Sequence, residues 1–163
     1  MDLELEKSEL IEELGVYFET NKILSHLAAR IFSLLILSEK DGTTFDELVT
    51  TLKASKSSVS TNLQLLQNTG RVIYFTKLGD RKRYFKAAPN DIIVQLDKKI
   101  AQWEQEKQLH EKLFAFKTNL YKEHNKYDEN LPGLQYTKNY ALFINDFIKN
   151  LKTLKNNLQN TLN

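Results

Sequence analysis

Two short amphipathic segments that follow each other almost without a break constrain the fold of this chain more than any other feature. Thr44 is a favourable helix N-cap, and Glu47, three residues later, completes a capping box. Only Lys53 and Ala54 separate this helix from Ser55, the N-cap of the next one. Two amphipathic helices joined by so short a turn predict a helix-turn-helix.

The second of these helices, expected over residues 55–69, has an unusual polar side. Val59, Leu63 and Leu66 recur at the helical period and form its apolar side. The other side carries short hydroxyl and amide side chains with one lysine and no acid. Because phosphates repel carboxylates, such a helix suits the surface of a DNA duplex. Taken alone, it fits equally well a polar amphipathic helix that binds no ligand.

A predicted β-hairpin with a basic tip follows. Residues 71–77 and 81–87 are rich in β-branched, aromatic and basic side chains, with a glycine-containing turn between them. A helix-turn-helix followed by such a hairpin predicts a winged helix. If the return strand begins at Arg81, then Arg81 and Arg83 share one face and Lys82 faces the other way. We favour DNA contact for these bases; the alternative is a charged edge strand that resists aggregation.

Longer helices are expected on both sides of this region. We expect helices at 3–20 and 23–38, the latter apolar nearly all round and therefore central to the core. Two more are expected at 90–126 and 136–158, with a loop at 128–134. The predicted apolar stripe of the first helix consists of Leu3, Leu10, Leu14, Tyr17 and Phe18, with Ile11 beside it.

The predicted fold class is mainly α with a small β-hairpin wing: a winged helix-turn-helix flanked by N- and C-terminal dimerisation helices. The predicted domains are 1–21, an N-terminal helix of the dimer module; 22–88, the DNA-binding winged helix-turn-helix; and 89–163, two long C-terminal helices for dimerisation. The terminal helices carry more apolar surface than a winged helix of ~65 residues can bury. We therefore expect a homodimer built from them.

Charge is distributed unevenly along the chain, although the net charge is only +2. Residues 1–20 contain seven acids and one base, whereas residues 53–86 contain eight bases and one acid, Asp80. A local basic field attracts a polyanion even when the whole molecule is nearly neutral. This asymmetry indicates a nucleic-acid-binding face.

Composition and the first residues restrict the compartment. The absence of cysteine excludes disulfides, cysteine-bound zinc and thiol redox sensing, and it fits a reducing compartment. The acidic N-terminus predicts no signal peptide, and the most apolar run, residues 31–37, is too short to span a bilayer. We expect a cytoplasmic protein with no membrane partner.

Residues 22–88 resemble the winged-helix domain of MarR-type transcription regulators. The stretch from Ala54 to Ser60 (ASKSSVS) matches the opening of that family's recognition helix, and Gly79 to Phe85 (GDRKRYF) is typical of the wing of its GbsR branch. The resemblance implies a homodimeric, ligand-responsive repressor on a near-palindromic operator. Its recognition helices, 55–69, would enter successive major grooves ~34–36 Å apart, and its wings, 77–86, the adjacent minor grooves.

Individual roles follow for the predicted DNA-binding residues, which are Lys56, Ser57, Ser58, Ser60, Thr61, Gln64, Arg81, Lys82 and Arg83. Gln64 can pair with adenine, and the hydroxyls can serve bases or phosphates. Lys56 is expected at a phosphate near the helix N-terminus. By family analogy, Arg81 or Arg83 enters the minor groove and an ion pair with Asp80 orients it.

An effector pocket is a second hypothesis. Some regulators of the GbsR type bind small cationic effectors, for which an aromatic cage would be suitable. The candidate residues are Tyr17, Phe18, His26 and Trp103. We favour ordinary core packing for the aromatic residues, and a hydrogen-bonded core histidine over a metal or effector ligand for His26.

The chain has no glycine-rich phosphate loop, metalloprotease motif or nucleophile elbow. We therefore predict no enzyme, no cofactor and no metal site. The expected partners are double-stranded DNA, a second copy of the chain and a small-molecule effector of unknown identity. Two alternatives remain, a winged-helix protein–protein interaction module and a nonspecific nucleic-acid-binding protein.

Overall fold

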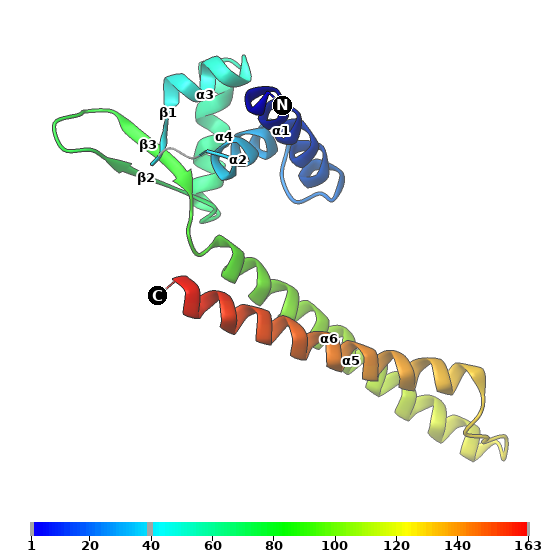
Figure 1. Cartoon of the computed structure of the whole chain (residues 1–163). Helices are drawn as coiled ribbons and strands as arrows, with labels where there is room; N and C mark the ends of the chain where they lie inside the picture. The colour runs from blue at the N-terminus through cyan, green and yellow to red at the C-terminus, as the bar shows by residue number, and fades with distance from the viewer. Residues whose placement is uncertain (1, 39–40, 163) are drawn as a thin grey trace. The chain divides into compact units, whose positions relative to one another are not determined.

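The computed structural model describes residues 2–38 and 41–162 (Figure 1). The chain divides into two compact units, Met1–Asp91 and Ile92–Asn163. The first contains α1 (Leu3–Thr20), α2 (His26–Ile36), β1 (Thr43–Thr44), α3 (Phe45–Leu52), α4 (Lys56–Asn68), β2 (Val72–Thr76) and β3 (Arg83–Ala87). The helices α5 (Asp91–Glu123) and α6 (Pro132–Leu162) form the second. This mainly α architecture with a small hairpin confirms the predicted fold class.

The sheet of the first unit has three antiparallel strands in the order β1-β3-β2. Tyr74 of β2 and Thr43 of β1 lie opposite Phe85 of β3. Gly42 precedes β1 with a φ of +86°. A Cβ on Gly42 would lie only 2.7 Å from Cβ of Tyr84 and 2.8 Å from the ring of Phe75, so a glycine is required for the loop to pass this close to the hairpin.

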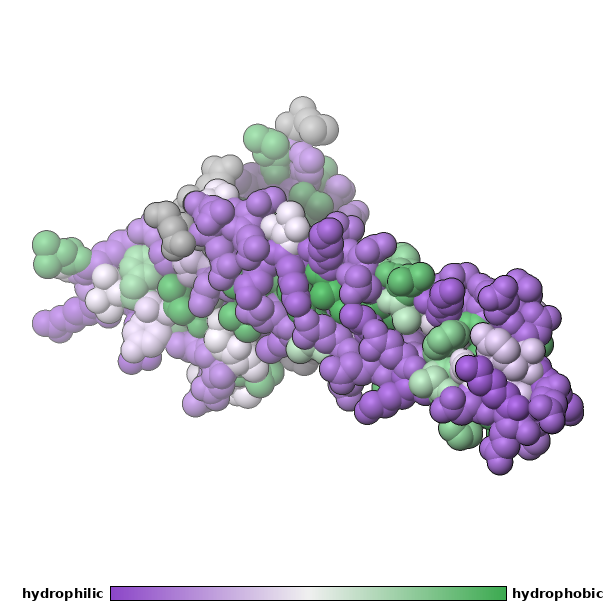
Figure 2. Space-filling model, turned by 90° about the horizontal axis from the view of Figure 1, so that it is seen from below, coloured by the Kyte–Doolittle hydropathy of each residue, from purple (hydrophilic) through white to green (hydrophobic). Residues whose placement is uncertain are grey.

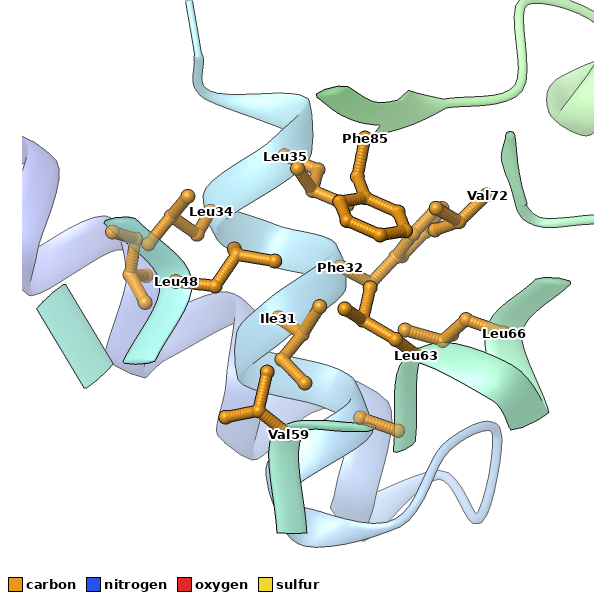
Figure 3. Close-up of a cluster of buried hydrophobic side chains, with 12 residues drawn as sticks. Ile31, Phe32, Leu34, Leu35, Leu48, Val59, Leu63, Leu66, Val72 and Phe85 are labelled. Atoms are coloured by element: carbon orange, nitrogen blue, oxygen red, sulfur yellow. The ribbon is translucent and has the colours of Figure 1, made fainter. Parts of the chain in front are cut away.

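The core of this unit is built around α2, as its nearly continuous apolar sequence predicted. Ile31 and Phe32 of α2 lie among side chains from α3, α4, β2 and β3 (Figure 3). The buried side chains contributed by these four elements are Leu48, Val59, Leu63, Leu66, Val72 and Phe85. The helix-turn-helix and the hairpin therefore share one core, which holds α4 and the wing on a common support.

Two expectations about α1 and α2 were wrong. The helix α2 begins at His26 rather than residue 23, because Ser25 takes the extended N-cap conformation. The helix α1 faces α2 through Ile11 and Gly15, whereas the predicted stripe residues Leu3 and Tyr17 are 73% and 54% exposed. Gly15 explains why α1 faces α2 with a different side from the predicted one. A Cβ at position 15 would lie 2.9 Å from Cγ of Arg30, so α1 can approach α2 this closely only at a glycine. Packed in this way, α1 belongs to the same unit as the winged helix.

In the second unit, α5 and α6 run antiparallel and are joined by a short loop (Figure 1). Ile100, Ile144 and Ile148 are buried between them, with Trp103 and Tyr140 packed alongside. The helix α6 starts at Pro132, inside the predicted loop 128–134, because proline is well tolerated where no N–H has to be paired.

Apolar side chains remain at the surface of both units. Figure 2 shows a face that is mostly hydrophilic with separate hydrophobic patches. On α5, Leu109, Leu113 and Phe116 are 59%, 40% and 64% exposed. Among the described residues, none of the helices combines the length and the apolar character needed to cross a membrane.

Candidate nucleic-acid interface

The helix α4, the predicted recognition helix, is held by its N-cap and by its apolar side. The Ser55 hydroxyl accepts the Ser58 N–H at 3.2 Å, which confirms the predicted cap. Val59, Leu63 and Leu66 are at most 2% exposed. These contacts fix both the start of α4 and the direction in which its polar side faces.

A further contact ties α4 to the start of α2. The Ser25 hydroxyl donates to Oδ1 of Asn62 at 3.1 Å, and Nδ2 of Asn62 donates to the Ser58 carbonyl at 2.9 Å. The Asn62 side chain therefore forms hydrogen bonds within the protein, although it is an amide like Gln64 of the predicted contact set. This role depends on a partner 37 positions away, which helical spacing does not reveal.

The predicted contact residues of α4 lie exposed on the side away from the core: Lys56, Ser57, Ser58, Ser60, Thr61 and Gln64. Some of their hydrogen-bonding capacity is already used. The Thr61 hydroxyl donates to the Ser57 carbonyl at 3.0 Å, and the Ser58 hydroxyl accepts from Ser55 at 2.8 Å. Both hydroxyls keep acceptor capacity, and the exposed Gln64 carboxamide offers both a donor and an acceptor.

The wing differs from its prediction at the start of the return strand. The turn is closed by the Asp80 N–H, which donates to the Lys77 carbonyl at 3.0 Å, with Gly79 at a φ of +81°. The strand β3 begins at Arg83, so Arg81 and Lys82 precede it and strand alternation does not place them. The Lys82 N–H donates instead to Oδ1 of Asp80 at 2.9 Å, a local bond that competes with pairing to β2.

Asp80 also has a different partner from the predicted one. Within the described parts of the chain its carboxylate makes no ion pair with Arg81 or Arg83. The Tyr84 hydroxyl donates to Oδ2 of Asp80 at 2.7 Å, and this bond is the main reason why the pKa of Asp80 is lowered. Arg83 lies with its guanidinium 4.8 Å from the centre of the Tyr74 ring.

A groove of about 600 Å³ separates α4 from the wing. Ser60 and Gln64 line it from α4, and Lys82 and Arg83 line it from the hairpin. The groove thus brings together predicted residues from two segments of the chain. The predicted contact set did not include the lining residues Gln67, Asn68 and Asp46. Asn68 lies one helical turn after Gln64, so the same periodicity would have found it.

The basic field is smaller than the count of bases suggested. Arg71 is only 9% exposed, its guanidinium lies 5.5 Å from the Phe32 ring centre, and it pairs with Asp91 at 3.6 Å. Lys86 pairs with Asp41 at 3.5 Å. The exposed bases of this region are therefore Lys53, Lys56, Lys77, Arg81, Lys82 and Arg83.

Three of the four candidate effector residues belong to the first unit, where the Tyr17 and Phe18 rings lie edge to face with their centres 5.6 Å apart. Phe18 packs against Phe32, with the ring centres 5.7 Å apart, and Trp103 packs against Phe147 in the other unit at 5.2 Å. His26 is not a core histidine: its side chain is 67% exposed, and Nδ1 lies 3.0 Å from Oε2 of Glu19. As the first residue of α2, it stands at the surface before the buried part of the helix begins. In the described chain no three His, Asp or Glu side chains are grouped as metal ligands.

A known regulator is similar in sequence to part of this chain. No family model matches the chain. Over 90 residues it is 34% identical to the HTH-type transcriptional regulator MmpR5 of Mycobacterium tuberculosis, covering 55% of this chain and 54% of that protein. The chain therefore spans about half the length of this curated relative.

Two solved structures align with much of this chain. A crystal structure of a transcriptional regulator aligns with a TM-score of 0.52 and 22% identity, over 96% of this chain and 95% of that one. A mutant of S. aureus MepR aligns with a TM-score of 0.42 and 18% identity, over 76% of this chain and 94% of that one. The first likeness supports the winged-helix fold.

Proposed function

We propose that the chain is a sequence-specific DNA-binding transcription regulator with no enzymatic activity. The observation that carries this proposal is the exposed polar surface of α4, which has no acid and faces a groove whose opposite wall carries Lys82 and Arg83. Amide and hydroxyl groups suit base edges, and the cationic groups suit phosphates. The similarity to a helix-turn-helix regulator over 90 residues supports the same function. Such a regulator acts in the cytoplasm of a bacterial cell.

In the proposed complex, α4 enters the major groove and residues 77–86 follow the adjacent minor groove. Gln64 pairs with an adenine, and Lys56 binds a phosphate near the N-terminus of α4, where the helix dipole also favours an anion. Arg81, Lys82 and Arg83 neutralise phosphates or enter the minor groove. All these side chains are exposed in the free protein, so binding requires no unfolding of the wing.

We propose that the functional unit is a homodimer formed by the terminal helices, with α1 and the α5–α6 hairpin as its dimer module. Leu109, Leu113 and Phe116 follow each other at helical spacing on α5 and remain exposed. A second copy would cover this stripe. The dimer would then present two recognition helices to half-sites about one helical turn apart, ~34–36 Å, in a near-palindromic operator.

The finer assignment is a ligand-responsive repressor of the MarR type, in the GbsR-like branch. A repressor of this design blocks transcription by occupying its operator. An effector need only favour a different spacing of the two recognition helices, because both half-sites can then no longer be bound together.

Selection of genomic DNA by the purified protein at near-physiological salt, followed by sequencing, tests the proposal. We expect an enriched inverted repeat with half-sites about one turn apart. Enrichment without a motif would instead favour a nonspecific nucleic-acid-binding protein. No enrichment, with or without candidate effectors, would favour a protein–protein interaction module.

Salt dependence separates these outcomes further. Each phosphate neutralised by the protein contributes about −0.9 to the slope of log affinity against log salt concentration. A dimer that uses its basic wings should therefore show a steep slope. A partner protein bound through apolar contacts would show almost none.

A further inference from the structure

The wing turn is held by one short chain of hydrogen bonds. Tyr84 of β3 donates its hydroxyl proton to Oδ2 of Asp80 at 2.7 Å, and Oδ1 of the same carboxylate accepts the Lys82 N–H at 2.9 Å. Tyr84, a residue of the regular strand, therefore holds the Asp80 carboxylate in position. The carboxylate in turn holds the backbone conformation between Asp80 and Lys82. Arg81 lies inside this closed segment.

The Tyr84 ring is itself firmly positioned. It stacks on Phe75 of the paired strand, with the ring centres 5.8 Å apart and the planes 28° from parallel. Lys77 lies with Nζ 4.1 Å from the centre of the Tyr84 ring. The loop at Gly42 passes so close to Cβ of Tyr84 that only a glycine fits. The phenol can therefore act as a fixed point for the more exposed turn.

We propose that Tyr84 is a positioning residue for DNA binding, which holds the wing turn through Asp80 and thereby directs Arg81 and Lys82 towards the nucleic acid. This inference rests on the proposed function. It assigns to Asp80 a backbone-holding role in place of the ion pair with Arg81 or Arg83 that the family resemblance implies.

The surroundings of the two bases support this role. Within the described residues, the side chains of Arg81 and Lys82 form no hydrogen bond or ion pair, and both are exposed. With Asp80 occupied by Tyr84 and the Lys82 N–H, their cationic groups remain available for phosphates. The bond also lowers the pKa of Asp80 and raises that of Tyr84, as expected when the carboxylate and the neutral phenol stabilise each other.

The two roles of Asp80 predict opposite results for one substitution. In Asp80→Asn, the amide oxygen can still accept the Lys82 N–H, and the amide nitrogen can donate to the Tyr84 oxygen. The turn is therefore kept, and one negative charge near the DNA is lost. If Asp80 instead acted as a counter-ion for an arginine, Asp80→Asn would be as harmful as Asp80→Ala.

The experiment compares full-length parent, Tyr84→Phe, Asp80→Ala, Asp80→Asn and the double variant Tyr84→Phe/Asp80→Ala. The probe is the strongest DNA fragment from the genomic selection, titrated at several salt concentrations. Tyr74→Phe is the matched control, because it also removes one hydroxyl from the hairpin while keeping the ring against Arg83. Thermal unfolding verifies that each variant is folded.

We expect Tyr84→Phe and Asp80→Ala each to weaken operator binding about three- to tenfold for each wing of the dimer, the range for one net hydrogen bond. The salt slope should become shallower by about one to two, since each dimer has two wings. The double variant should be no weaker than Asp80→Ala, because both changes act through one contact. Asp80→Asn should bind at least as tightly as the parent. The control Tyr74→Phe should bind with the affinity of the parent.

Two results would overturn the inference: parent-like affinity and slope for Tyr84→Phe, or a loss for Asp80→Asn equal to that for Asp80→Ala. The second result would restore the ion-pair role. Failure of the proposed function looks different, because the parent protein itself would then select no operator.

Discussion

The proposed recognition helix and the wing present similar polar surfaces, but they are held by different kinds of contact. The helix α4 buries Val59, Leu63 and Leu66 in the core, so its polar side is positioned by apolar packing. The wing turn is exposed, with Leu78 completely accessible, and is positioned by hydrogen bonds and ring contacts around Tyr84. A change on the buried side of α4 should therefore affect the whole fold, whereas a change in the wing turn should affect binding alone.

The largest effect is expected for Leu63→Ala. Leu63 is 2% exposed in the core shared by α2, α4 and the sheet, so truncation leaves a cavity. We expect a loss of about 2–5 kcal/mol in the free energy of unfolding, measured by denaturant titration. Leu65→Ala on the same helix is the control, because Leu65 is 45% exposed. Equal losses for the two variants would contradict the assigned orientation of α4.

The same contrast explains which parts of the structure were predictable from sequence. The caps Thr44 and Ser55 and the buried side of α4 were predicted correctly, because capping and helical periodicity are properties of neighbouring residues. The start of β3 was not, because the bond between Asp80 and the Lys82 N–H competes with strand pairing. Two local arrangements were available to Asp80, and only the position of Tyr84 decides between them.

Non-local packing caused the other errors. The inward face of α1 depends on Gly15 approaching Arg30, a residue of the next helix. Arg71 was counted among the DNA-facing bases, but its guanidinium packs on the Phe32 ring and forms an ion pair with Asp91. The groove between α4 and the wing was also beyond sequence reasoning, since it depends on how the hairpin folds back beside α4. The residue types of the site were predictable; which of them face the same groove was not.

The next largest effect is expected for Arg81→Ala combined with Arg83→Ala. Both side chains are exposed on the hairpin, so the fold should keep the stability of the parent. We expect operator affinity to fall on the order of 100-fold, and about equally for all sequences, with a shallower salt slope because phosphate contacts are lost. Fluorescence anisotropy at several salt concentrations measures both quantities.

The control for this double variant removes the same charge elsewhere. Lys98 and Lys99 are exposed on α5 and are not among the proposed DNA-contacting residues. Replacing both by alanine should leave the salt slope close to that of the parent. If this control lost as much affinity as the arginine variant, general charge rather than the wing would account for the effect.

A smaller and more selective effect is expected for Gln64→Ala. The Gln64 side chain is exposed in the groove beside α4, and a carboxamide can form two hydrogen bonds with adenine. Its removal should cost about 1–3 kcal/mol of discrimination at one base pair in each half-site and leave the other positions unchanged. A second selection with the variant would show relaxed preference at that position. A uniform loss at every position would instead assign Gln64 to a phosphate.

The smallest effect is the pH dependence of the wing turn. It gives the clearest distinction between the wing turn and the N-cap of α4. The cap of α4 consists of Ser55 and the Ser58 N–H and has no titrating group, whereas the wing turn depends on the Asp80 carboxylate. The bond from Tyr84 lowers the pKa of Asp80 below the ordinary range of an aspartate carboxyl. Because the folded-state pKa is lowered, the stabilisation is complete above the unfolded value and is lost as pH falls through the folded one.

The amide signals of Lys82 and Ser58, followed by NMR between neutral pH and the acid limit of the fold, test this difference. The Lys82 amide should shift with a midpoint below the ordinary aspartate value of about 3.9, while the Ser58 amide should show no such transition. Asp80→Asn should abolish the Lys82 transition. A Lys82 midpoint at the ordinary value would mean that Tyr84 does not hold the carboxylate in solution, and the wing would then be no more than a basic hairpin whose turn is set by Gly79.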